Sequence, residues 1–443
     1  MPRQRSEVSA ATKKTRNSRN PPAITTQQRL RESTTPLNAE EEQDLDLNNR
    51  DRSESSEDED DPMEDENEDT KTCLKEAARA LSRDKHTQSC SKYLRKLRRQ
   101  ARWIKRLLGP AVDMSDLLLY GPFCLDSDLD ANLPDLSLDA FDQESFDNIC
   151  DEDRQRMGNQ YRSLFNIIPS LRTDLEFFAA NETRMLRFTS FLSENADAGR
   201  RDDVKIIKQG IVELLPDNGE NDTPITVQDR SKAERGWYNF ATARLLCSRS
   251  MLGAFEDNSD TFATEVVEGR RCLHAGDFMT FLYEEDADYD ELDVESGFLR
   301  NKFLLKVFRY IFTGRASAFS STPGPSYIGR APIAVAAKRT TVTPEMIAWT
   351  VVMTYFALCS QETWCLRDGG VYLPDLWNEI VEVFEDKESR WVIETLQWWN
   401  FHVWGPSSVK ADLRFQRHSQ TSTAAKLRAQ RAARKAARES STG

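Results

Sequence analysis

The sequence predicts a mainly α-helical protein, with one globular helical domain over 154–405. Three observations indicate this fold class. Apolar residues in this stretch recur at helical spacing in most segments. The same stretch holds 8 of the 9 tryptophans, whereas the first 92 residues contain no aromatic residue. Strand signals are restricted to two short candidates, 223–227 and 330–336.

The charged residues lie in blocks, and the blocks predict the rest of the organisation. Within a net charge of −13, residues 1–35 hold 8 basic and 2 acidic side chains, and 40–69 hold 2 and 17. Residues 71–106 hold 13 basic and 2 acidic side chains, and residues 113–153 hold 13 acidic and no basic ones. Residues 410–438 hold 9 basic and 1 acidic side chain. Lacking aromatics, 1–70 should be disordered, because it cannot bury enough apolar surface to offset its ordering entropy. We expect a basic amphipathic helix over 71–110, an acidic linker over 111–153, and a basic Ala/Arg-rich tail over 406–443.

The first half of the domain contains three predicted helices. Tyr161, Leu164, Phe165 and Ile168 share one face of a helix over 156–168. Apolar spacing continues over 171–192. A third helix over 203–215 should end before Pro216.

The second half contains four more, and their starts are marked by capping residues. Ser296 is a candidate N-cap for a helix over 298–312. Thr343, followed by Pro344, is the candidate N-cap for a helix over 346–359, and Asp375 is the candidate for a helix over 376–384. The last helix covers 388–402. We expect Trp349, Trp391 and Trp398 to be buried packing residues.

The basic segment 92–108 combines a heptad-like apolar stripe with a cationic surface. The stripe consists of Leu94, Leu97, Ala101, Ile104 and Leu108. The cations are Lys92, Arg95, Lys96, Arg98, Arg99, Arg102, Lys105 and Arg106. Such a helix can form a coiled coil or fill a partner's groove, dock on the chain's own acidic block 113–153, lie on an acidic membrane, bind nucleic acid or direct nuclear import.

Two further segments carry functional predictions. The tail is rich in helix-forming Ala, Arg and Lys, and its cations suit phosphate contacts or nuclear import; they are Lys426, Arg428, Arg431, Arg434, Lys435 and Arg438. Ser55 and Ser56 precede Asp58 and Glu59 at the +3 positions that acid-directed kinases favour, so both are candidate phosphorylation sites.

No motif for catalysis, metal binding or a cofactor is present. The sequence has no Gly-rich phosphate loop, no His-Glu-x-x-His, no Gly-x-Ser-x-Gly and no Cys-x-x-Cys. The acidic run 284–295 lacks the glycine that a calcium loop requires at its turn. We therefore expect no catalytic or metal-ligating residue, no cofactor and no evident small-molecule substrate. No apolar run is long enough to span a bilayer, and no secretory leader is expected.

Six segments of the C-terminal half form a recognisable series: DDVKIIKQGIVELLP (202–216), ERGWYNFATARLLCS (234–248), GDFMTFLYEEDADYD (276–290), SGFLRNKFLLKVFRYIFTGRASA (296–318), VTPEMIAWTVVMTYFALCSQETW (342–364) and LQWWNF (396–401). In these segments, residues 202–404 resemble a domain of unknown function found in many proteins of mushroom-forming (basidiomycete) fungi. The resemblance implies a fungal origin and a mostly helical domain, and it transfers no catalytic residue.

Three functions from different classes fit these observations. The first is a non-enzymatic nuclear interaction protein whose charged arms contact nucleic acid or chromatin proteins. The second is a cytoplasmic protein–protein interaction module with solubilising tails. The third is a mobile-element-derived enzyme with a carboxylate metal site. The block charges favour the first, with an intracellular, nuclear location.

Overall fold

The computed structural model describes residues 70–83, 88, 91–126, 130, 132–134, 142–216 and 231–406, except Asp286 and Asp288. The prediction of a mainly α-helical protein is confirmed for this part of the chain. Its one sheet is a two-residue antiparallel pair, β1 (Arg367–Asp368) and β2 (Val371–Tyr372), in which Arg367 lies opposite Tyr372. Almost all of 1–70, the tail from 407 on and the candidate strand 223–227 lie outside the described residues.

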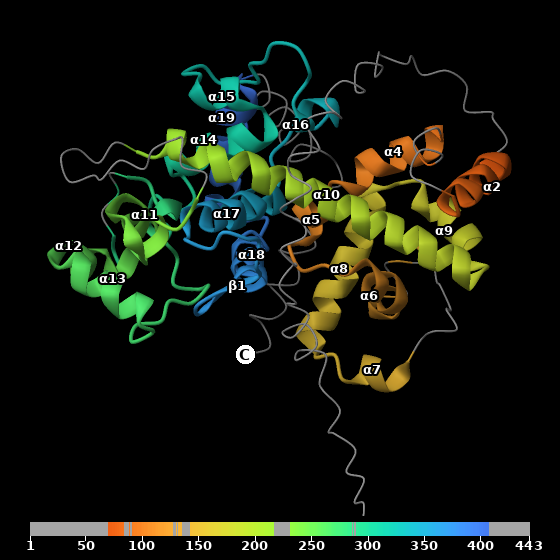
Figure 1. Cartoon of the computed structure of the whole chain (residues 1–443), viewed down its shortest axis with the longest axis horizontal. Helices are drawn as coiled ribbons and strands as arrows, with labels where there is room; N and C mark the ends of the chain where they lie inside the picture. The colour runs from red at the N-terminus through yellow and green to blue at the C-terminus, as the bar shows by residue number, and fades with distance from the viewer. Residues whose placement is uncertain are drawn as a thin grey trace, which may run out of the picture.

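Short helices precede the longest one. In chain order they are α2 (Thr70–Leu81), α4 (Lys92–Ala101), α5 (Ile104–Leu108), α6 (Met114–Tyr120), the 3-10 turn η5 (Gly121–Cys124), α7 (Gln143–Asp147), α8 (Asp151–Ile167) and α9 (Leu171–Ala179). The long α10 (Glu182–Leu214) then crosses the molecule, as Figure 1 shows.

The C-terminal half follows α10 in the chain. Its helices are η7 (Gly236–Tyr238), α11 (Phe240–Leu246), η8 (Arg249–Met251), α12 (Leu252–Asp257), α13 (Ser259–Val267), η9 (Thr280–Leu282), α14 (Lys302–Phe312), α15 (Arg315–Phe319), α16 (Ile333–Ala336), α17 (Pro344–Leu358), α18 (Leu373–Glu382) and α19 (Arg390–Trp404). This half packs on α10 through two of these helices, α14 and α17.

Helix α10 connects the two halves. Its 33 residues span roughly 50 Å at 1.5 Å per residue. α2, α4, α5, α6 and α9 contact α10, and so do α14 and α17 of the C-terminal half. Two predicted boundaries are corrected here. The stretch 171–192 breaks before Asn181, whose side chain accepts the backbone N–H of Arg184 at 3.0 Å and caps α10. The predicted helix 203–215 is the end of α10.

Helix α17 is the centre of the core. It begins at Pro344 with Thr343 at the N-cap position, as predicted, and its side chains from Met346 to Leu358 are all buried. A helix that is buried on every side has no polar face, which explains why apolar residues predominate along its whole length. α17 packs against α5, α10, α14 and α18, so it contacts elements from both halves of the chain.

Three other predictions in this half are wrong. Helix α14 starts at Lys302 and is capped by Asn301, not by Ser296, because the N–H of Leu299 is held by the carbonyl of Leu282 at 2.7 Å in a turn. Helix α18 starts at Leu373, two residues before Asp375. The candidate strand 330–336 contains instead the short helix α16, which follows Pro332.

The tryptophan prediction is confirmed at Trp349, which is fully buried, and corrected in α19. There Trp399 is 0% exposed, and its indole N–H donates to the carbonyl of Leu299 at 2.9 Å. Trp398 and Trp391 are only half-buried at the edge of the core. The periodicity of 388–402 could not separate adjacent tryptophans, since both lie near the apolar face.

The core continues before residue 154. The predicted helix 92–108 is broken at Arg102–Trp103 into α4 and α5, and its apolar stripe is buried against the chain's own helices. Met114, Leu117 and Leu118 of the acidic segment lie in the same cluster. Nothing in the described part of the chain combines the length and apolar character that a bilayer-spanning helix needs.

Candidate functional site

The basic segment 92–106 divides into an exposed and a buried part. From α5, Arg106 donates Nε–H to Asp203 Oδ2 at 2.6 Å and Nη2–H to Oδ1 at 2.7 Å. Lys105 lies 3.8 Å from a carboxylate oxygen of Asp197, and Arg102 pairs with Asp202 at 2.8 Å. All three carboxylates belong to α10. In the part of the chain that the structure describes, the charged groups of this segment therefore pair with α10, and the Lys105 ammonium also donates to the carbonyl of Val112 at 2.8 Å.

The Arg106–Asp203 pair is almost fully enclosed. Both side chains are at most 4% exposed. Asp203 also accepts the indole N–H of Trp349 at 2.9 Å, and Arg106 donates to the carbonyl of Gly199 at 3.1 Å. A β-carbon at Gly199 would lie 2.3 Å from the carbonyl oxygen of Arg102, so glycine permits this close approach. Arg106 is thus a structural residue that joins α5, α10 and α17.

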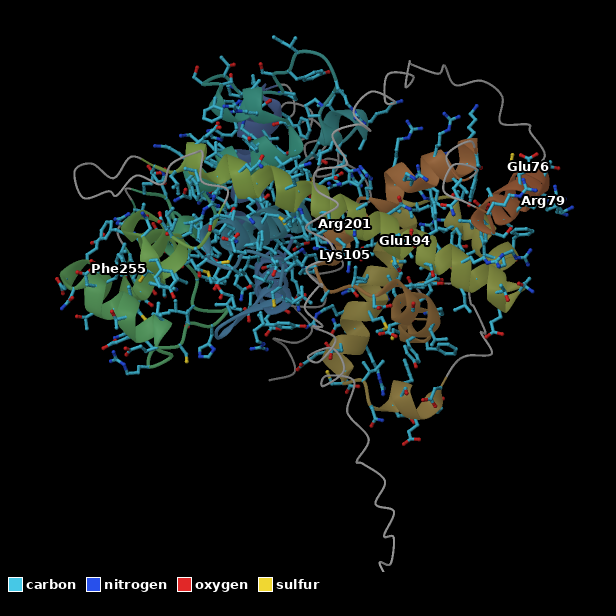
Figure 2. The ribbon with its side chains drawn as sticks, viewed as in Figure 1. Glu76, Arg79, Lys105, Glu194, Arg201 and Phe255 are labelled. Carbon is cyan, nitrogen blue, oxygen red and sulfur yellow. The ribbon has the colours of Figure 1, made fainter. Side chains whose placement is uncertain are left out.

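The exposed cations of α2 and α4, with Arg83 just after α2, form what we call the basic face. Its members are Lys71, Lys75, Arg79, Arg83, Lys92, Arg95, Lys96 and Arg99, all exposed. The two helices contact each other and both contact α10. In Figure 1 they lie at one end of the molecule, and Figure 2 labels Glu76 and Arg79 at the outer edge of α2.

Helical periodicity turns these cations outward. Lys71, Lys75 and Arg79 are spaced by four residues, opposite the buried Leu74 and Ala77. On α4, Lys92, Arg95, Lys96 and Arg99 form one stripe, and Leu94, Leu97 and Ala101 face the core. The α2 cations were missed as individual candidates in the sequence. Their spacing opposite Leu74, Ala77 and Leu81 is the signal that could have found them.

Acidic side chains barely offset this charge. Glu76 is the acidic residue of α2, and α4 has none. Arg98, half-buried, lies 6.0 Å from the ring centre of Phe191, and burial lowers its pKa together with the nearby charge of Arg102. The cations of the two adjacent helices repel one another, and a bound polyanion reduces that repulsion. The basic face therefore suits a ligand with several regularly spaced negative charges.

A cleft elsewhere on the molecule has the opposite charge. It has a volume of about 600 Å³ and lies between the α5–α6 loop, α8 and the start of α18; Asp113, Asp116, Asp153 and Asp375 are among its lining residues. A neighbouring cavity of about 290 Å³ adds Glu152, Glu345, Glu382 and Glu385. Burial and nearby carboxylates raise the pKa of Glu382. This cleft would repel nucleic acid and suits a cationic partner.

A group of shifted titratable residues lies at the end of α17. The ammonium of Lys232 is fully buried, donates to the carbonyls of Phe356 and Gln361, and lies 3.6 Å from Cys359 Sγ. Burial lowers the pKa of Lys232 to about 8 and raises that of Cys359 to about 11. Because Lys232 binds helix-terminal carbonyls, it satisfies the end of α17. Its position is that of a structural cap.

Glu362 holds the segment around Lys232 in place. Burial raises the pKa of its carboxyl, but hydrogen bonds from Lys208, Ser231 and the backbone of Lys232 outweigh burial and bring the pKa to about 2. Neither Lys232 nor Glu362 lines either acidic cavity. The charged groups of this cluster are therefore held by partners within the protein, and the cluster does not form a substrate site in either cavity.

The possible metal ligands in the part of the chain that the structure describes are His, Cys, Asp and Glu side chains. No group of three or more His, Cys, Asp or Glu residues there is arranged to hold a metal ion. The described cysteines are free thiols. Of the predicted site residues, Ser55, Ser56 and the six cations from Lys426 to Arg438 lie outside the described residues.

Comparison with protein families gives a match over much of the C-terminal half. Residues 194–404 match the model of a family of unknown function (DUF6698). The match begins inside α10 and ends with α19, so it includes Asp197, Asp202 and Asp203 but not the basic face. No curated protein and no solved structure matched the chain.

Proposed function

With residues 194–404 in a family of unknown function, we propose that this chain is a non-enzymatic nuclear interaction protein that binds nucleic acid through its basic face. The observation that carries the proposal is the set of eight exposed cations on two adjacent helices, with Glu76 as the one acidic residue of those helices. The family domain serves as the scaffold, because α10 supports both α2 and α4.

The chemistry of the basic face indicates the kind of binding. Lysine and arginine neutralise phosphates and release counterions, so affinity falls steeply with salt. Neither α2 nor α4 presents a known base-reading motif, so binding should be independent of sequence. The tail cations from Lys426 to Arg438 would add a second set of phosphate contacts. The same basic segments would direct nuclear import.

The test is a duplex DNA titration at several salt concentrations. Lys75, Arg95, Lys96 and Arg99 are replaced together by glutamine. If each contacts one phosphate, the log–log salt slope should become shallower by about 3.6. The matched control replaces Lys302, Lys306, Arg330 and Lys387, exposed cations on other elements, by glutamine. Equal slopes for the two variants would refute the proposal, because net charge alone would then explain binding.

A protein–protein interaction module is the second candidate, and the acidic cleft favours it. A cationic peptide would find eight carboxylates in the two neighbouring cavities, with Arg156 shared between them. A pull-down with nuclease treatment separates the two candidates. Partners that persist after nuclease, and after deletion of both charged ends, would favour a cytoplasmic module. The third function, a mobile-element-derived enzyme with a carboxylate metal site, would require bound Mg²⁺ or Mn²⁺.

A further inference from the structure

A small cavity opens beside the basic face, where the end of α2 meets the start of α10. Its volume is about 230 Å³. The described residues that line it are Ala78, Arg79, Leu81, Ser82, Asn181, Thr183, Arg184 and Arg187. Three of them are arginines and none is acidic. This is a concentrated positive charge with hydroxyl and amide groups around it.

The three arginines come from two helices that are distant in sequence. Arg79 lies on α2, and Arg184 and Arg187 lie in the first two turns of α10. None of the three forms an ion pair with another of the described residues. Glu76 and Glu182 are on the same helices, but neither lines the cavity. Bringing three guanidinium groups together without a carboxylate is unfavourable unless an anion compensates them.

One contact orients the guanidinium of Arg184, and another holds the backbone at the end of α2, where Arg79 lies. The guanidinium of Arg184 lies 4.0 Å from the ring centre of Phe177, and its buried Nε has no hydrogen-bond partner among the described residues. Ser82 donates to the carbonyl of Arg79 at 2.7 Å, which fixes the end of α2. An arginine that is already oriented loses less entropy when it binds a ligand.

We propose that this cavity binds one phosphate group of a nucleic-acid backbone. Guanidinium groups pair with phosphate oxygens through two parallel hydrogen bonds, which lysine cannot offer. The hydroxyl of Thr183 can donate to a further oxygen. None of the described lining residues is aromatic, so they offer no surface on which a base could stack. The inference rests on the proposed function, and makes Arg79 the point where the basic face meets a specific phosphate site.

The first experiment uses inorganic phosphate as the probe. Line broadening in ³¹P NMR is followed at constant ionic strength for the full chain, for Arg79→Gln/Arg187→Gln and for Lys75→Gln/Arg95→Gln. The control pair removes the same charge from the basic face outside the cavity. We expect saturable binding in the unmodified chain and the control, and roughly tenfold or greater weakening in the cavity variant. Absence of saturation, or equal weakening in both variants, would overturn the site.

The second experiment uses duplex DNA with the same three proteins. The cavity variant should lose affinity and flatten the salt slope by about 1, since its two arginines share one phosphate; the control pair should flatten it by about 2. DNA binding that is intact in the cavity variant would overturn the assignment to the nucleic-acid backbone. If the chain binds inorganic phosphate but no DNA, the proposed function fails and the cavity remains a phosphate site for another ligand. If it binds DNA but no inorganic phosphate, the cavity proposal fails alone.

Discussion

The two parts of the basic segment have the same composition and opposite environments. In α4, Lys92, Arg95, Lys96 and Arg99 point into solvent. A few residues later, Arg102, Lys105 and Arg106 pair with carboxylates of α10. The difference is not in the local sequence, because both parts alternate leucine or isoleucine with cations. It comes from acidic residues about a hundred positions later in the chain.

The comparison shows how a charged residue becomes structural. Removing a guanidinium from water costs several kcal/mol, which only well-placed partners offset. Asp203 supplies a bidentate carboxylate and Gly199 a carbonyl, so Arg106 is satisfied inside the core. Among the described residues, Lys96 has no such partner, and its side chain is exposed. The part of the segment that can bind a ligand is therefore the part whose cations are exposed.

The largest expected effect is on stability. Arg106→Ala leaves Asp203 buried without its cation, and such a loss typically costs about 3–5 kcal/mol. Arg99→Ala, on the exposed part, should change the free energy of unfolding by no more than about 0.5 kcal/mol. Urea denaturation of both variants measures this difference. Equal and small losses would mean that the Arg106–Asp203 pair contributes no more than a surface ion pair.

The tail extends the comparison to a third basic segment. If all six cations from Lys426 to Arg438 contact phosphates, deletion of 424–443 should flatten the log–log salt slope of DNA binding by about 5. The same deletion should reduce nuclear accumulation. DNA titration and imaging of the truncated chain give the two readouts. An unchanged slope together with an unchanged location would remove the tail from the proposed function and favour the cytoplasmic module.

The smallest effect concerns the acidic block that precedes α2. Phosphorylation of Ser55 and Ser56 would add roughly −1.5 to −2 charges each near a basic face that begins at Lys71. The block should then compete with DNA for the exposed cations and weaken binding modestly. Kinase-treated wild type is compared with Ser55→Ala/Ser56→Ala in the same titration. Identical affinities would show that the block does not reach the basic face.

Sequence patterns located most of the scaffold. The periodicity of 156–168 and the Thr343-Pro344 start correspond to α8 and α17, because helix periodicity and N-terminal capping are local properties. Sequence patterns predicted the ends of the helices less well. Asn301 caps α14 because Leu299 is held by a distant carbonyl, and α10 runs on through two predicted segments. Among adjacent tryptophans, only packing decides that Trp399 and not Trp398 is enclosed.

By itself, the sequence determined the helical class, the separation of charge into blocks and the positions of the basic segments, since each follows from composition and short-range spacing. The tertiary structure alone decided which cations are exposed and can bind a ligand. It paired Arg106 with Asp203, exposed the stripe on α4 beside that on α2, and brought Arg79 to Arg184 and Arg187. The physical reason is that electrostatic energy depends on distance and burial in space, and residues a hundred positions apart set both.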